Sequence, residues 1–349
     1  MTNNRAPRTD RPRRSRSRLL GLTLPLLGLG LGLGLTTFEP PQLAALTPAQ
    51  APALALHFEP NPFVVRTITA QLGGEFAGQG ALDRTPERRP ALGEVYWTVP
   101  EPTSAEVLAA TWGLGRDLYA LNPDIGPGAH LPAGAALRVY QPDPERPTQS
   151  VGAPNRGKLI NGMPIPEGEH WRLRSMRRRA YGSELTVNAL VSAFNAYGER
   201  FPGAPKIRVG ELAQRKGGKI SPHRSHRSGR DVDLGYIALG EDDGDVRWQL
   251  MNASNLDVEK NWYLIHEMIK SGEVESIFIS SRLQPLLYAE AKRHLTEEEL
   301  SGLFQYPRSA PGSKDAVIRH WSGHRNHMHV RFRCEDWNSR CRATKHDAH

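Results

Sequence analysis

The sequence predicts an α+β protein with a small antiparallel sheet and flanking helices, preceded by a smaller βααβ module. Apolar residues at helical spacing indicate the helices, most clearly at 185–200, and further helices are expected at 258–271 and 284–294. Alternation of apolar and polar residues indicates the strands, most clearly at 231–234 and 327–332. A chain of 349 residues is too long for one small core, so about two domains are expected.

The first 51 residues are typical of an export leader. Residues 1–18 contain seven arginines and one aspartate, and an uncharged apolar run of 17 residues follows at 19–35. A basic segment before an apolar one is the arrangement of a secretory signal, and the small residues at 49 and 51 offer a cleavage site. The alternatives are an uncleaved signal anchor, for which five glycines and Pro25 make a poor helix, and a twin-arginine signal at 13–14.

The leader also accounts for most of the positive charge. The formal net charge is +8, and residues 1–18 contribute +6 of it (7 − 1). The rest of the chain therefore carries only about +2 (8 − 6), which gives no electrostatic argument for a nucleic-acid partner. Contact with a membrane is expected only through the leader.

Composition divides the chain after the leader into further segments. Residues 52–91 are rich in proline and alanine and are predicted to be a linker, and residues 92–142 form the βααβ module. A second linker covers 143–151, and the longer globular stretch covers 152–333. The tail at 334–349 contains both cysteines of the chain.

Two cysteines are too few for a disulfide scaffold or for a zinc site of four thiolates. Export would place Cys334 and Cys341 in an oxidising compartment, where thiols so close in the chain can pair. We therefore expect a disulfide that closes a short loop, with two free thiols as the alternative.

Six of the 13 histidines fall in two short segments, and two aspartates accompany them: His223, His226, Asp231 and Asp233 in the first, and His320, His324, His327 and His329 in the second. In a strand, Asp231 and Asp233 share one face, and so do His327 and His329. Adjacent carboxylates repel one another, and adjacent imidazoles compete for hydration, unless a cation or a proton lies between them. Imidazole and carboxylate ligands suit Zn²⁺, whose catalytic sites take three protein ligands and a water. The alternative is a group of solvated histidines on loops.

Other catalytic motifs are incomplete in this sequence. His266 and Glu267 begin like the H-E-x-x-H zinc helix, but Lys270 stands where the second histidine belongs. Neither a Ser-x-x-Lys nucleophile motif nor a phosphate-binding glycine loop occurs. The acidic run at 241–245 is expected to be a solvated loop, with a weak calcium site as the alternative.

The segment 116–140 resembles the second half of a LysM domain, the small glycan-binding module of cell-wall proteins. The resemblance rests on Leu121-Asn122-Pro123, on the Leu-Pro-Ala-Gly sequence at 131–134 and on the final strand. The usual Gly-Asp-Thr opening of that family is replaced by the residues at 100–104, so the module is a degenerate one. The resemblance implies binding to glycan strands, and a βααβ module of unrelated role is the alternative.

The stretch 152–333 resembles the penicillin-insensitive murein endopeptidases, which are zinc peptidases of the lysostaphin and D-Ala-D-Ala-peptidase superfamily. The resemblance runs through 157–162, Phe201-Pro202 and 209–212, and it is most specific at the two histidine segments. It implies that His226, Asp233 and His329 bind Zn²⁺. It also implies that His327 transfers protons and that His324 assists it or stabilises the charged intermediate.

Further residues beside these motifs have less definite roles. His223 is expected either behind the ligands or as an auxiliary metal ligand, and Asp231 is expected to orient a ligand or a neighbouring arginine. Murein peptides carry free carboxylates, so Arg224, Arg227 and Arg230 are candidate substrate contacts, with simple solvated arginines as the alternative.

The sequence therefore predicts an exported, periplasmic zinc endopeptidase that cleaves peptide cross-links of peptidoglycan, of the D-alanyl–diaminopimelate type. An uncleaved leader would hold it at the inner membrane. A D-Ala-D-Ala carboxypeptidase or dipeptidase of the same superfamily is one alternative, although those families place a glutamate where this chain has Asn326 and His327. A non-catalytic, zinc-stabilised wall-binding protein is the other.

Overall fold

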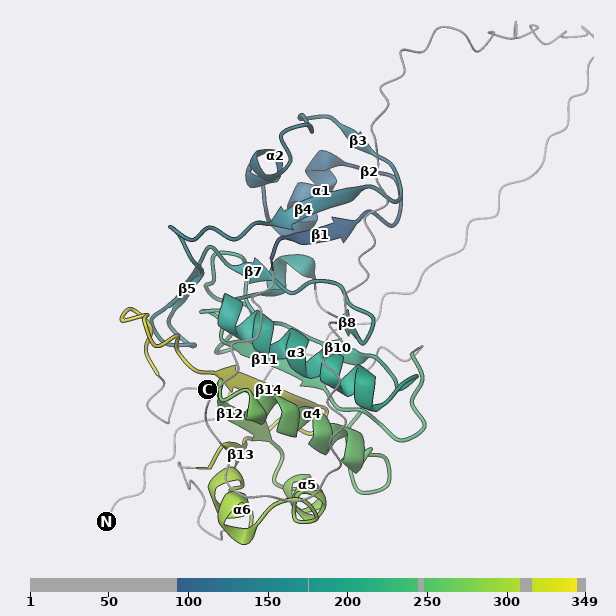
Figure 1. Cartoon of the computed structure of the whole chain (residues 1–349), viewed down its shortest axis with the longest axis vertical. Helices are drawn as coiled ribbons and strands as arrows, with labels where there is room; N and C mark the ends of the chain where they lie inside the picture. The colour runs from purple at the N-terminus through teal and green to yellow at the C-terminus, as the bar shows by residue number, and fades with distance from the viewer. Residues whose placement is uncertain (1–92, 175, 244–247, 308–315, 344–349) are drawn as a thin grey trace, which may run out of the picture. The chain divides into compact units, whose positions relative to one another are not determined.

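The computed structural model describes residues 93–174, 176–243, 248–307 and 316–343 (Figure 1). All described residues belong to a single compact unit. The predicted leader and the linker at 52–91 lie outside the described residues. Within the described ranges, no helix has both the length and the apolar character needed to cross a membrane.

The first folded segment has the predicted order of strand, helix, helix, strand. Strand β1 (Val95–Thr98) pairs antiparallel with β4 (Ala136–Tyr140), and helices α1 (Ala105–Trp112) and α2 (Asp117–Leu121) lie between them in the chain. A short pair, β2 (Thr103–Ser104) with β3 (His130–Leu131), was not predicted. Ser104 caps α1 by accepting a hydrogen bond from Val107 N. The residues at 100–104, which replace the usual Gly-Asp-Thr opening, therefore still provide a start for this helix.

The second segment is built on a six-stranded sheet in the order β13-β12-β14-β11-β10-β8. These strands are β8 (Trp171–Leu173), β10 (Ile207–Val209), β11 (Asp231–Gly235), β12 (Val274–Ile279), β13 (Ile318–His320) and β14 (His327–Phe332). The α+β class is confirmed, but the sheet is larger than expected and only its centre is antiparallel, because β8 and β13 pair parallel with their neighbours. Strands of three residues such as β8, β10 and β13 are too short to show a period of two in the sequence.

Helices α3 (Glu184–Arg200) and α4 (Val258–Lys270) lie side by side across one face of this sheet (Figure 1). Each starts at a side-chain cap, where Ser183 accepts from Thr186 N and Asp257 accepts from Lys260 N. Both match their predicted ranges to within one residue. Helix α5 (Gln284–Ala291) ends earlier than predicted, and α6 (Glu297–Leu303), which begins with a capping box, was missed.

Smaller elements complete the segment: β5 (Gln149–Val151), β6 (Lys158–Ile160), β7 (Met163–Pro164), the 3-10 helix η1 (Arg177–Arg179) and β9 (Tyr181–Gly182). Strand β5 lies at the end of the predicted second linker, and it pairs antiparallel with β6.

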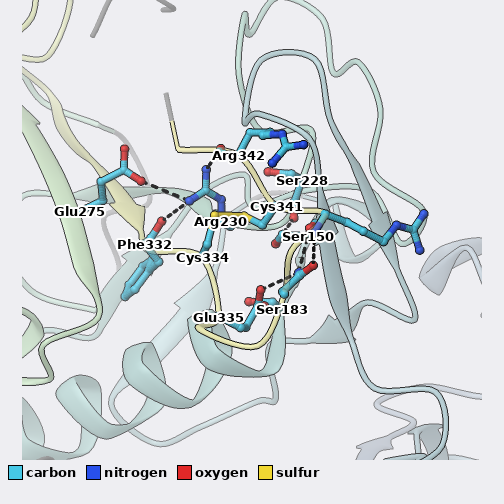
Figure 2. The surroundings of a disulfide bond; sticks show 12 residues. Ser150, Ser183, Ser228, Arg230, Glu275, Phe332, Cys334, Glu335, Cys341 and Arg342 are labelled. Atoms are coloured by element: carbon cyan, nitrogen blue, oxygen red, sulfur yellow. Dashed lines mark hydrogen bonds and ion pairs between the residues drawn. A yellow bond between two sulfur atoms is a disulfide. The ribbon is translucent and has the colours of Figure 1, made fainter. Parts of the chain in front are cut away.

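The predicted disulfide between Cys334 and Cys341 is confirmed (Figure 2). The tail that it closes lies against the start of the second segment, where Gly152 bridges Cys341 and Asn338 Nδ2 donates to Ser150 O. Figure 2 shows the Arg230 guanidinium at the centre of this region, where it donates to the carbonyls of Phe332 and Arg342. The tail is therefore part of the folded structure.

Candidate metal centre

The centre is built on the antiparallel pairing of β11 with β14. In this register Asp233 lies opposite His329, and Gly235 lies opposite His327. Val232 and Val330 alternate with these residues and are fully buried on the other side of the strands. The alternation expected from the sequence is confirmed, and it brings a carboxylate from one strand beside an imidazole from the other.

His226 enters the centre from the loop before β11 with an unusual backbone conformation. Its φ is +62°, in the left-handed region that a non-glycine residue rarely adopts. Its backbone N–H donates to Asp231 Oδ2 at 3.1 Å, and its Nδ1–H donates to Leu212 O at 2.9 Å. These two bonds turn Nε2 toward Asp233 Oδ1, at 3.3 Å.

Four imidazoles surround the Asp233 carboxylate, with nitrogen–oxygen distances of 3.0–3.8 Å. Its Oδ1 lies 3.0 Å from His329 Nδ1, and its Oδ2 lies 3.6 Å from His223 Nδ1. Asp233 and His226 are each 1% exposed, yet Asp233 Oδ2 and His226 Nε2 make no hydrogen bond with any described residue. Buried polar atoms normally have a partner. An imidazole whose other nitrogen is held by a carbonyl is also typical of a metal ligand, so these residues fit a bound metal ion.

Asp231 connects His329 to a buried arginine. Its Oδ1 lies 3.4 Å from His329 Nε2 and accepts a hydrogen bond from Arg331 Nε at 2.8 Å. Because His226 N also donates to Asp231, this one carboxylate orients both histidines. Asp231 therefore contacts His226, His329 and the Arg331 guanidinium at once.

His223 gives a second combination of donor atoms. Its donor atom and those of His226 and Asp233 all lie within 4.8 Å of one another, and its Nε2 is 3.8 Å from Glu211 Oε2. The rings of His223 and His329 are each 4.7 Å from that of His226. His226 and Asp233 therefore belong both to this set and to the set predicted from the sequence, which has His329 in the place of His223.

His324 and His327 lie next to these residues. Their ring centres are 4.8 Å apart, and His327 Nε2 is 3.8 Å from Asp233 Oδ1. His327 Nδ1 is 2.7 Å from the side-chain oxygen of Asn326, which fixes the ring. His320 lies apart on β13, where its Nδ1 accepts from Ser281 N. Five of the six histidines singled out in the sequence thus come together.

Burial and charge act in opposite directions on these groups. Burial favours the neutral forms of His226 and Asp233, but their mutual attraction outweighs it. The pKa of His226 is raised to about 9, and the pKa of Asp233 is well below its usual range. Burial lowers the pKa of His327 to about 4, so its imidazole is neutral at neutral pH. Without a metal ion, the pair of His226 and Asp233 is held as an ion pair.

The three candidate arginines differ in position. Arg224 is exposed, and Arg227 is half-buried with its backbone N–H bonded to Pro154 O. Arg230 is fully buried beside the disulfide, where it contacts Glu275 and two backbone carbonyls (Figure 2). Its guanidinium is therefore not available to a substrate.

Residues that sequence reasoning missed surround the centre. Trp248 stacks on His327 with ring centres 4.7 Å apart, and no periodicity or motif marks it in the sequence. Glu241, expected in a solvated acidic loop, is instead buried against Arg208. For Glu241 that expectation was wrong because a long-range ion pair leaves no local signal, whereas Asp242 and Asp243 are exposed as expected.

Comparison with known proteins shows a similarity to one peptidase family over part of the chain. The model of the penicillin-insensitive murein endopeptidase family matches residues 150–295. The predicted resemblance is confirmed. Proteins named penicillin-insensitive murein endopeptidase from Escherichia coli and Shigella boydii are 23% identical to the chain over 235 residues, which cover 63% of it and 79% of each relative. The family match includes His226 and Asp233 and ends before β14, so the part played by His329 depends on the geometry.

Proposed function

We propose that the chain is an exported zinc metallopeptidase that hydrolyses peptide cross-links of murein, of the D-alanyl–diaminopimelate type. One observation carries this proposal: buried His226 and Asp233 lie in the segment that resembles murein endopeptidases, and β14 brings buried His329 opposite Asp233. An exported enzyme of this kind would act in the periplasm. The Cys334–Cys341 disulfide supports an oxidising compartment.

His226, Asp233 and His329 are the residues that would bind the metal. They offer two imidazole nitrogens and a carboxylate oxygen, a donor set that zinc accepts in catalytic sites. When bound, zinc would polarise the scissile carbonyl and lower the pKa of a water molecule toward about 7. Asp231, held by Arg331, would keep His226 and His329 in position, and His223 is proposed as an auxiliary ligand or a support for Asp233.

His327 would act as the proton-transfer group. It lies 3.8 Å from Asp233 and is partly exposed, so a water and a peptide can both reach it. Its imidazole would accept a proton from the attacking water and return it to the leaving amine. His324, beside it, would assist this transfer or stabilise the negative charge that develops on the carbonyl oxygen.

The βααβ segment would bind the glycan strands of the same polymer. Its strand, helix, helix, strand order supports this proposal, together with the Leu-Asn-Pro sequence at 121–123, where Asn122 connects α2 to β4 through Arg138. Exposed Arg224 and half-buried Arg227 remain proposed substrate contacts.

The experiment that tests the proposed reaction is digestion of purified cross-linked muropeptide dimers by the protein with zinc added. We expect conversion of dimers to monomers, loss of that activity with a chelator, and its loss in His329→Ala. His320→Ala is the matched control, because His320 belongs to the same sequence segment but lies on β13, and it should retain activity.

Other products would identify a different function. Release of terminal D-alanine without dimer cleavage would show a carboxypeptidase of the same superfamily. Binding to intact murein without any product would show a non-catalytic wall-binding protein, and both outcomes would overturn the proposal.

A further inference from the structure

Arg174 is a cation without a carboxylate partner near the centre. It follows β8, and its backbone N–H donates to Val209 O at 2.7 Å. Among the residues that the structure describes, no carboxylate pairs with its exposed guanidinium, whereas Arg177 and Arg179 nearby pair with Glu167 and Glu211. An exposed arginine is usually solvated, so its surroundings decide whether it is placed for binding.

The guanidinium of Arg174 lies over the indole ring of Trp248, 4.7 Å from the ring centre. This contact limits the directions that a long side chain can sample, and it leaves the N–H donors at the edge of the guanidinium plane open. The indole itself stacks on His327 at 4.7 Å with an angle of 29° between the planes. Trp248 thus connects the cation to the proposed proton-transfer group.

Two glycines make room for this indole. A Cβ atom at Gly210 would lie 2.7 Å from the Trp248 ring, and one at Gly235 would lie 3.1 Å from its Nε1. Gly210, directly after β10, donates through its N–H to Asp233 O, and Gly235, at the end of β11, lies opposite His327, so both glycines adjoin residues of the centre. The backbone that positions the metal ligands therefore also positions Trp248.

The distances fit a substrate that spans both groups. The ring centres of His327 and Trp248 are 4.7 Å apart, and the guanidinium carbon of Arg174 is 4.7 Å from the Trp248 ring centre. An extended peptide advances about 3.5 Å per residue, so a carboxylate within about two residues of a bond held at His327 would reach Arg174. Arginine binds a carboxylate through two parallel hydrogen bonds, which fixes orientation as well as charge.

We infer that Arg174 is a specificity residue that binds a free carboxylate of the substrate peptide, and that Trp248 positions it. This inference rests on the proposed function, since it names the group of the murein peptide that the same site would recognise. It predicts that the protein prefers cross-links with free carboxylates to the same cross-links carrying carboxamides.

The test compares Arg174→Gln with the wild type on muropeptide dimers that have either free or amidated carboxylates. On dimers with free carboxylates, the KM of the variant should be about tenfold higher or more, and its kcat should stay within about twofold of the wild type. The reason is that the lost charge-assisted contact is made both in the substrate complex and in the transition state. On amidated dimers the wild type and the variant should be equal. Trp248→Phe, which keeps an aromatic face, should give a smaller rise in KM.

Arg178→Gln is the matched control, because Arg178 is an exposed arginine on η1 and carries the same charge. Equal losses on both substrates, or the same rise in KM in Arg178→Gln, would overturn the inference. If the wild type cleaves neither dimer, the proposed function fails, and calorimetric binding of the uncleaved dimers then decides the role of Arg174. Weaker binding of the free-carboxylate dimer alone in Arg174→Gln would support it, and unchanged binding would contradict it.

Discussion

At the scale of single residues, the centre depends on carboxylates that serve several partners. Asp233 faces four imidazoles, whereas Asp231 faces His329, the backbone of His226 and the Arg331 guanidinium. Of these two aspartates, only Asp233 has a buried oxygen that makes no hydrogen bond with the described residues. This difference supports the proposed roles of Asp233 as a metal ligand and of Asp231 as a residue that orients ligands.

This difference predicts unequal effects of two similar substitutions. Asp233→Asn should abolish stoichiometric zinc binding, because it removes a ligand charge from the centre. Asp231→Asn should keep zinc but weaken its affinity by about 10–100-fold, which is typical for groups that orient ligands. Competition titration with a coloured chelator measures both affinities.

Asp124→Asn, at an exposed position in the first folded segment, is the control for a lost carboxylate and should bind zinc as the wild type does. Equal zinc affinities in Asp231→Asn and Asp233→Asn would contradict the assignment. Circular dichroism of each variant separates loss of zinc from loss of fold.

At the scale of elements, the loop before β11 is shaped by glycines that approach other backbone segments. Gly217 has a φ of +69°, and a Cβ atom there would lie 2.2 Å from Arg227 O. Its neighbour Gly218 has a φ of +90°, but nothing lies within 4 Å of its Cβ position. The two positions share a left-handed backbone and differ in the space around them.

Alanine substitutions at these two positions separate the cost of a left-handed backbone from the cost of a steric clash. Gly218→Ala should lower the free energy of unfolding by about 1 kcal/mol, the cost of a left-handed alanine. Gly217→Ala should lower it by about 2 kcal/mol more, because the backbone of Arg227 must also move. Urea unfolding followed by circular dichroism measures both, and equal values would show that the loop is not packed as described.

Local signals explain which elements the sequence could predict. The limits of α3 follow from its apolar spacing and its Ser183 cap, which lie within a few residues of each other. The shared faces of Asp231 and Asp233, and of His327 and His329, follow in the same way from alternation. The register that places Asp233 opposite His329 joins residues 96 positions apart, so no local pattern contains it. The contact of Trp248 with His327 was missed for the same reason.

At the scale of the whole molecule, the loop at 334–341 is fixed to the start of the second folded segment. The Cys334–Cys341 loop lies against β5 through Gly152 and Asn338, and Arg230 connects it to β14 through Phe332 O. The metal-ligating side chains take no part in these contacts. We therefore expect the disulfide to contribute to stability, and the residues on β11 and β14 to carry out the proposed reaction.

Replacing both cysteines tests this separation. Cys334→Ser with Cys341→Ser should lower the free energy of unfolding by about 2–3 kcal/mol, since a short loop is no longer closed in the unfolded chain. Zinc affinity and dimer cleavage should stay within about twofold of the wild type, because the contacts of the Cys334–Cys341 loop with the described residues involve none of the five clustered histidines. Reductant should destabilise the wild type and not the variant. A matching loss of zinc affinity would contradict the separation.

The most direct test of the central claim is the position of the metal itself. Anomalous diffraction at the zinc edge, from crystals of the full chain grown with zinc, locates the ion without reference to activity. We expect one peak per chain, within about 2.0–2.2 Å of His226 Nε2, Asp233 and His329 Nδ1. A peak bound by His223 in place of His329, or no peak between β11 and β14, would contradict the account.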